Sequence, residues 1–138
     1  MFSEIAEIKS IREQKSRLSA REKELTEPTL TDLDMIRTLY DWFKEIWADR
    51  ECPGRLESVN QRKKFIFIVL FLYSPSTLAG GRISNKIREV LSEVMGCTPY
   101  YISHNVESVI FFYQQYKDFR QDVDWVFTEI MKRVKQTI

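Results

Sequence analysis

Cysteine, histidine, glycine and proline are scarce in this chain of 138 residues, which holds two cysteines, one histidine, four glycines and four prolines. Cys52 and Cys97 are too few for a disulfide framework and are not spaced as metal ligands, although a single bridge between them is compatible with the sequence. The only histidine, His104, has no cysteine beside it in the helical pattern. Neither a glycine-rich phosphate loop nor a CxxC or HExxH motif is present. We therefore expect no enzymatic activity, no metal and no cofactor.

Long apolar runs and an export signal are also absent. The longest apolar run, residues 65–73, has nine residues, about half of the roughly 20 that a membrane-spanning helix needs. The first ten residues, MFSEIAEIKS, carry acidic side chains where a signal peptide has a basic region. These absences predict a cytoplasmic protein without a membrane segment.

Hydrophobic and aromatic residues are plentiful, at 43% and 13%, and this composition predicts a folded core. The net charge of +1 conceals an uneven distribution. Residues 58–88 contain no acidic side chain and six basic ones, namely Arg62, Lys63, Lys64, Arg82, Lys86 and Arg88. Such a stretch is either a solvated face or a surface that contacts phosphates.

Apolar residues recur at helical spacing along most of the chain, which predicts an all-α fold of about five to six helices. Residues 1–27 are expected to form an N-terminal helical arm with a thin apolar stripe. We interpret this arm either as a solvated helix lying on the domain or as an oligomerisation helix. Residues 28–138 are expected to form a single helical domain, whose last helix spans about residues 118–135.

Several helix starts in the domain show the capping-box pattern, in which a capping residue precedes an acid or amide by three positions. Three pairs resemble it: Thr31 with Asp34, Ser58 with Gln61, and Asp118 with Gln121. The run at residues 65–73 is rich in Phe, Ile and Val and would also suit a buried strand. We predict a helix there, because no other segment offers a strand with which it could pair.

Residues 84–116 have the form of a helix-turn-helix. Apolar residues at helical spacing precede Gly96, which stands where a helix end needs a left-handed residue. Thr98 and Pro99 then open a second helix. Its apolar stripe consists of Ile102, Val106, Val109, Ile110, Tyr113 and Tyr116. The second helix of such a motif can enter the major groove of DNA.

The usual helix-turn-helix pattern fits at four positions, Leu91, Ser92, Met95 and Ile102. On this register the groove-facing residues are Thr98, Tyr100, Tyr101, Ser103, His104 and Glu107. They are polar or aromatic and can bond to base edges or phosphates. No arginine or asparagine stands at the helix start to make bidentate base contacts, so base specificity does not follow from the sequence.

The segments QRKKFIFIVLFLY, NKIREVLSEVMG and TPYYISHNVESV follow one another over residues 61–116. In this order they resemble the tri-helical core of bacterial and phage helix-turn-helix proteins and, more faintly, the C-terminal duplex-binding domain of the replication initiator DnaA. Arg62, Lys63 and Lys64 match the basic helix start of that family, whereas residues 98–105 lack its Asp-His-Thr signature. The resemblance implies a protein of phage or mobile-element type that binds double-stranded DNA, with basic residues on phosphates and the helix from Pro99 in the groove.

Large aromatic residues on outer helix faces support a second hypothesis. The helical wheel places Phe111 and Trp125 away from the apolar stripes of their helices. They are then either covered by the N-terminal helix or part of an interface with a second copy or another protein. The alternative is therefore a helical interaction protein, for example a phage structural or packaging component, that does not bind DNA.

Overall fold

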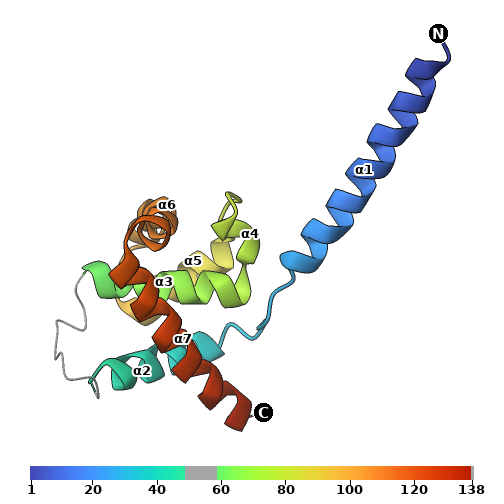
Figure 1. The fold of residues 1–138 in the computed structure, drawn as a ribbon. Helices are drawn as coiled ribbons and strands as arrows, with labels where there is room; N and C mark the ends of the chain where they lie inside the picture. Colours follow the sequence, from blue (N-terminus) through green and yellow to red (C-terminus); the bar gives the residue numbers. More distant parts are fainter. Residues whose placement is uncertain (49–58, 138) are drawn as a thin grey trace.

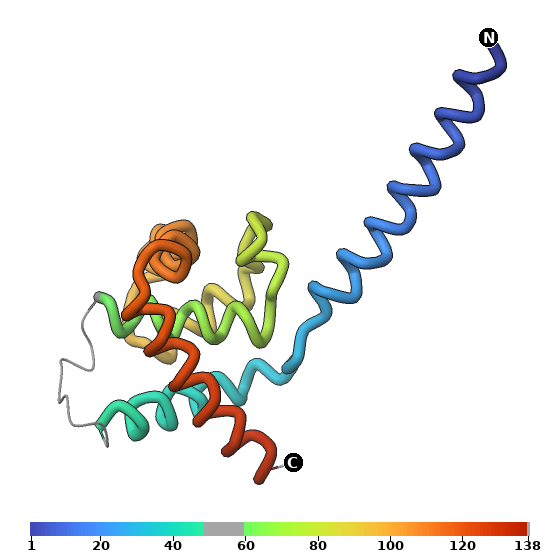
Figure 2. The backbone as a smooth tube through the Cα atoms, viewed as in Figure 1, coloured from blue at the N-terminus to red at the C-terminus, as the bar shows by residue number. Residues whose placement is uncertain are grey.

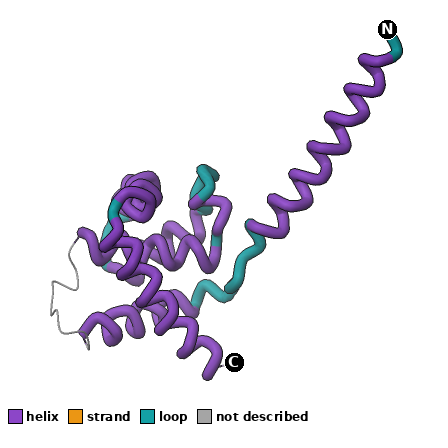
Figure 3. Tube along the Cα trace, in the orientation of Figure 1, coloured by secondary structure: helices purple, strands orange, loops and turns teal. Residues whose placement is uncertain are grey.

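The computed structural model describes residues 1–48 and 59–137, and every regular element in these two ranges is an α-helix (Figures 1 and 3). The helices are α1 (Ser3–Leu25), α2 (Met35–Ala48), α3 (Val59–Tyr73), α4 (Pro75–Leu78), α5 (Asn85–Met95), α6 (Pro99–Gln115) and α7 (Lys117–Thr137). The all-α prediction is therefore confirmed. The described part of the chain has one helix more than expected, and the shortest of its helices is the single turn α4 between α3 and α5.

Helix α3 is the centre of the fold, and α2, α4, α6 and α7 all pack against it. From Phe65 to Tyr73 its side chains are buried, apart from Phe67 and Phe71. The helix predicted for residues 65–73 is thus confirmed, and the alternative of a strand is wrong. A helix that is apolar on nearly all sides is stable only when neighbours cover it, and four helices cover most of this run while Phe71 stays exposed.

Two of the predicted capping boxes differ from the structure. Helix α2 begins at Met35, and the backbone N–H of Asp34 donates to the carboxylate of Asp32 at 3.0 Å. Asp32 therefore takes the part that we had predicted for Thr31. Helix α7 begins at Lys117, so Asp118 lies inside its first turn, where a carboxylate favours the positive end of the helix dipole. The third box starts at residue 58, which lies outside the described residues.

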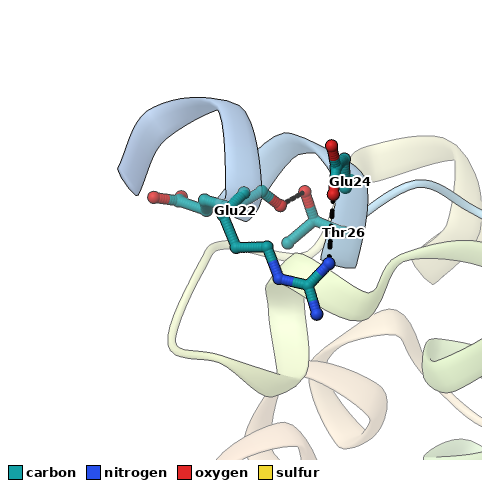
Figure 4. Close-up of polar contacts among 4 residues, drawn as sticks. Glu22, Glu24 and Thr26 are labelled. Carbon is teal, nitrogen blue, oxygen red and sulfur yellow. Dashed lines mark hydrogen bonds and ion pairs between the residues drawn. The ribbon is translucent and has the colours of Figure 1, made fainter. Parts of the chain in front are cut away.

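Helix α1 projects away from the other helices (Figures 1 and 2), and none of its residues is buried. At its end the Thr26 hydroxyl donates to the carbonyl oxygen of Glu22 at 2.8 Å, and Arg21 pairs with Glu24 at 3.0 Å (Figure 4). The interpretation that this arm lies on the domain is therefore wrong. The division of the chain at residue 27 stays a prediction.

The chain joins the packed helices just after α1. The backbone N–H groups of Thr29 and Leu30 both donate to the carbonyl oxygen of Leu72, at 2.9 and 3.0 Å. Nearby, the hydroxyl of Tyr73 donates to the carbonyl oxygen of Asp32 at 2.7 Å. These bonds attach residues 29–32 to the end of α3. We call helices α2 to α7 with residues 29–34 the body of the protein.

None of the helices in the described ranges combines the length and the apolar character that crossing a membrane requires.

Candidate nucleic-acid interface

Local backbone geometry joins α5 to α6 through a short turn. The Ser84 hydroxyl caps α5 by accepting from the N–H of Ile87 at 3.2 Å. Gly96 ends this helix with a φ of 68°, which favours glycine because a side chain there would be strained. The Thr98 hydroxyl then accepts from the N–H of Tyr101 at 3.1 Å and caps α6. Both helix ends are as the sequence predicts, while a DNA-binding role for this helix pair stays a prediction.

All four pattern positions of the proposed helix-turn-helix are buried. Leu91 and Ile102 are fully enclosed, and Met95 and Ser92 are nearly so. The Ser92 hydroxyl donates to the carbonyl oxygen of Glu89 at 2.8 Å, so its burial leaves no polar group without a partner. The four positions are therefore buried, while the helix-turn-helix itself stays a prediction.

The predicted apolar stripe of α6 is wrong at its far end. Tyr116 is half exposed. Helix α6 ends at Gln115, and Tyr116 has an extended backbone with a φ of −109°. Because the helix ends one residue earlier, helical periodicity no longer places the Tyr116 side chain on the inner face.

The outward face of α6 begins with an aromatic pair. Thr98, Tyr100 and His104 are exposed, Tyr100 at 76%. The rings of Tyr100 and His104 stack with their centroids 5.9 Å apart and their planes within 13°. Two flat polar rings held parallel on the first turns of a helix offer hydrogen-bonding atoms and a stacking surface to a ligand.

Arg88 links this face to α5. One guanidinium nitrogen donates to the Ser103 hydroxyl at 3.3 Å, and the other donates to the side-chain oxygen of Asn85 at 2.6 Å. The pair of bonds holds the planar guanidinium at the junction of α5 and α6. Asn85 is not among the residues predicted for the site, although its spacing of three residues from Arg88 on one helix could have indicated the contact.

A hollow of about 490 Å³ opens beside this junction, between α6 and the connection that precedes α5. Arg82, Arg88, Ser103 and Glu107 are among its lining residues, and Val106 and Ile110 are among its apolar ones. We call it the arginine hollow. Two arginine side chains and one glutamate side chain line it, so its charge favours an anionic group. It brings together two predicted phosphate contacts, Arg82 and Arg88, and two predicted groove residues, Ser103 and Glu107.

Two further cations from α3 lie on aromatic rings of α6. The guanidinium carbon of Arg62 is 5.5 Å from the ring centroid of Tyr101, and the ammonium of Lys63 is 4.1 Å from that of Phe112. Both side chains are half-buried. Arg62 also lies close to the free thiol of Cys97: burial raises the pKa of this thiol, and the charge of Arg62 acts in the opposite direction. These contacts hold the positive charges of Arg62 and Lys63 against α6.

Lys64 is the exception among the six basic residues. It is only 7% exposed, and its ammonium pairs with the Asp122 carboxylate at 2.8 Å while lying 4.9 Å from the ring centroid of Trp47. A buried ammonium held by a carboxylate cannot reach a phosphate outside the protein. The prediction of Lys64 as a DNA contact is therefore wrong, since this side chain is part of the interior.

The two remaining basic residues face solvent. Arg82 and Lys86 are both exposed, one before α5 and the other in its first turn. Tyr101 differs from the other predicted groove residues, because it is half-buried beneath Arg62. It supports this surface and is not at its outermost edge.

Two large aromatic side chains, Phe111 and Trp125, are exposed elsewhere on the body. Phe111 is 52% exposed and Trp125 is 38% exposed, as the helical wheel predicts. Helix α1 covers neither of them, so the interpretation that the N-terminal helix buries them is wrong. Phe71 and Phe127 also border an apolar groove of about 240 Å³ between α3, α6 and α7.

Within the described ranges, no group of three or more His, Cys, Asp or Glu side chains is placed to hold a metal ion. Comparisons of the chain with known protein families, with curated proteins and with solved structures gave no match.

Proposed function

We propose that this protein binds double-stranded DNA and catalyses no reaction. In this proposal the first turns of α6 enter the major groove, where Thr98, Tyr100, Ser103 and His104 face the bases and the adjoining backbone. The phosphates on either side are contacted by Arg62, Lys63, Arg82, Lys86 and Arg88. One observation carries the proposal: Arg88 on α5 donates to Ser103 on α6, so predicted phosphate and groove residues share the arginine hollow.

Electrostatics support the same surface. Cationic side chains provide most of the affinity of proteins for duplex DNA, because they release counterions from the phosphates. Arg82 and Lys86 are exposed, and Arg88 is fixed next to them by two hydrogen bonds. A fixed guanidinium loses less conformational freedom when it binds a phosphate. The start of α6 adds the positive end of a helix dipole to this region.

The outward residues of α6 are suited to positioning the helix on DNA. Tyr100 and His104 form a stacked pair at the tip of the helix, and hydroxyl and imidazole groups bond to phosphate as well as to base edges. Glu107 also lines the hollow, and its carboxylate would oppose a phosphate at that end. The proposed contact therefore centres on the N-terminal half of the outward face, away from Glu107.

The proposal is tested with a matched pair of double variants. Arg82→Ala with Lys86→Ala removes two exposed charges from the proposed surface, and Lys132→Ala with Lys135→Ala removes two from the exposed face of α7. We expect the first double variant to bind random duplex DNA more weakly. Its slope of log K against log salt should be flatter by about 1.8, the value for two phosphate contacts. The second double variant should bind almost as the parent protein does.

Gel-shift titrations at two salt concentrations measure both quantities. Absence of any shift with the parent protein at low salt would overturn the proposal. An equal loss in both double variants would do the same, because it would assign binding to net charge and not to this surface.

The second candidate function is that of a helical interaction or assembly protein without DNA binding. The exposed Phe111 and Trp125 and the apolar groove beside Phe71 favour it, because large exposed aromatic surface commonly marks a protein interface. On this hypothesis the arginine hollow is only part of a solvated face, and the gel-shift titration should detect no complex with duplex DNA.

A further inference from the structure

Helix α1 exposes a row of aliphatic side chains to solvent. Ile8 is 52% exposed, Ile11 43%, Leu18 70% and Leu25 61%, and no residue of this helix is buried. An isolated helix gains little stability in water, and burial of one face normally supplies the rest. Figure 1 shows α1 projecting away from the other helices, and none of these helices covers it. Within the described residues the aliphatic row has no cover, and a second protein chain would supply one.

The spacing of this row is that of a coiled coil. Residues 8, 11, 15, 18, 22 and 25 alternate steps of three and four, which keeps them on one gently winding face. The aliphatic residues fill four of these six core positions. Lys15 and Glu22 fill the other two. A charged residue at a core position costs stability, but it determines which partner and orientation are accepted.

The two core charges discriminate between orientations of a second copy. In a parallel, in-register pair, Lys15 faces Lys15 of the second copy and Glu22 faces Glu22, so both polar layers bring like charges together. In an antiparallel pair, residue 8 faces 25, residue 11 faces 22 and residue 15 faces 18. Every core position of each helix then has a partner within α1.

The antiparallel arrangement also brings the opposite charges of Lys15 and Glu22 close together. The six core positions form two sets, 8, 15 and 22 in one and 11, 18 and 25 in the other. In an antiparallel pair, positions of one set from the two helices lie on the same side of the interface in neighbouring layers. Lys15 therefore lies one layer from Glu22 of the second copy, and the symmetry repeats this attraction once more. The stems of Lys15 and Glu22 pack against Leu18 and Ile11 of the second copy, while their charged ends reach the edge of the pair.

We propose that α1 is covered by α1 of a second copy, and that the two helices form an antiparallel coiled coil. The 23 residues of α1 extend over about 35 Å. Because the helices run in opposite directions, the two bodies lie at opposite ends of the pair and do not collide. This self-association does not depend on DNA binding, since it uses no residue of the body.

The test measures the mass of the full-length chain by sedimentation equilibrium over a range of concentrations, without DNA. We expect a reversible dimer for the parent protein and a monomer for Leu18→Asp, which places a carboxylate in the core of the pair. Circular dichroism and tryptophan fluorescence of Leu18→Asp should show an intact body. A parent protein that stays monomeric, or a Leu18→Asp variant that still dimerises, would overturn the proposal.

Charge variants test the orientation. Lys15→Glu should weaken the antiparallel dimer severalfold, because it places two carboxylates in neighbouring layers. Lys15→Glu combined with Glu22→Lys restores the attraction and should restore dimerisation. The matched control is Arg17→Glu, which makes the same charge change on the outer face of α1 and should leave the dimer nearly unchanged. A parallel pair would instead show equal affinity for the parent, the single and the double variant, and this outcome contradicts the proposal.

Discussion

Helices α1 and α3 differ in what keeps them helical. Helix α1 has 23 residues, eleven of them charged, and none is buried. Helix α3 has 15 residues, and its second half is enclosed by α2, α4, α6 and α7. Local pairs such as Arg21 with Glu24 contribute only about 0.2–0.5 kcal/mol each. Burial of one large aliphatic side chain contributes about 1.5–3 kcal/mol. The helical state of α3 therefore depends on the tertiary fold, whereas that of α1 depends on its own sequence and on any partner.

The largest contrast is expected for isoleucine at the two helices. Ile66 is fully buried in α3, and Ile5 is 63% exposed in α1 outside the six core positions. Ile66→Ala should lower the free energy of unfolding by about 2–5 kcal/mol, because it leaves a cavity. Ile5→Ala should change it by less than about 0.5 kcal/mol. Urea unfolding followed by tryptophan fluorescence measures both. Similar losses for the two variants would mean that α1 packs on the body.

Lysine residues of the two helices should also differ in how much they contribute to stability. Lys64→Met removes the ammonium that lies 2.8 Å from the Asp122 carboxylate, and the Asp122 side chain is 22% exposed. We expect a loss of about 1–3 kcal/mol, between the values for exposed and buried ion pairs. Lys9→Met on the exposed surface of α1 should cost almost nothing.

A double variant refines this contrast. Replacing both partners, by Lys64→Met with Asp122→Leu, should recover part of the stability that Lys64→Met loses, because both members of the pair are then apolar. The same urea titration applies. A Lys64→Met protein as stable as the parent would show that the ammonium is not held inside the body.

A pH-dependent effect is expected at the boundary between the two regions, where Tyr73 at the end of α3 bonds to Asp32. Burial, with a smaller contribution from the charge of Asp32, raises the pKa of Tyr73 to about 12. The unfolded chain releases the same proton near pH 10. Stability should therefore be constant below about pH 10 and fall between about pH 10 and 12, by up to about 1.4 kcal/mol per pH unit from this group.

The control for the pH effect is Tyr73→Phe. This variant should lose about 1 kcal/mol below pH 10, through the missing hydrogen bond, and should show a shallower decline above it. Tyr113 and Cys97 also have raised pKa values, but they act equally in both proteins and cancel in the difference. Urea midpoints measured from neutral to strongly alkaline pH give the result. Parallel pH profiles for the parent and Tyr73→Phe would contradict the assignment.

Short-range rules made the candidate site partly predictable. Gly96 ends α5, and Thr98 with Pro99 begins α6, because left-handed glycine, a capping hydroxyl and a proline in the first turn act within a few residues. The same holds for the outward position of Tyr100 and His104, which follows from helical periodicity once α6 exists. Thr31 shows the limit of such rules, since Asp32 supplies the bond that we had assigned to it.

The sequence by itself determined the helices, their apolar faces and the turn before α6, because these depend on residues a few positions apart. It could not separate Lys64 from Arg82, which belong to the same acid-free stretch. Only the tertiary structure placed Lys64 against Asp122, 58 positions along the chain, and left Arg82 exposed beside α6. It likewise brought Arg88 to Ser103 and left α1 without a neighbour. The physical reason is that burial and charge pairing depend on which helices meet, and local patterns carry little information about distant partners.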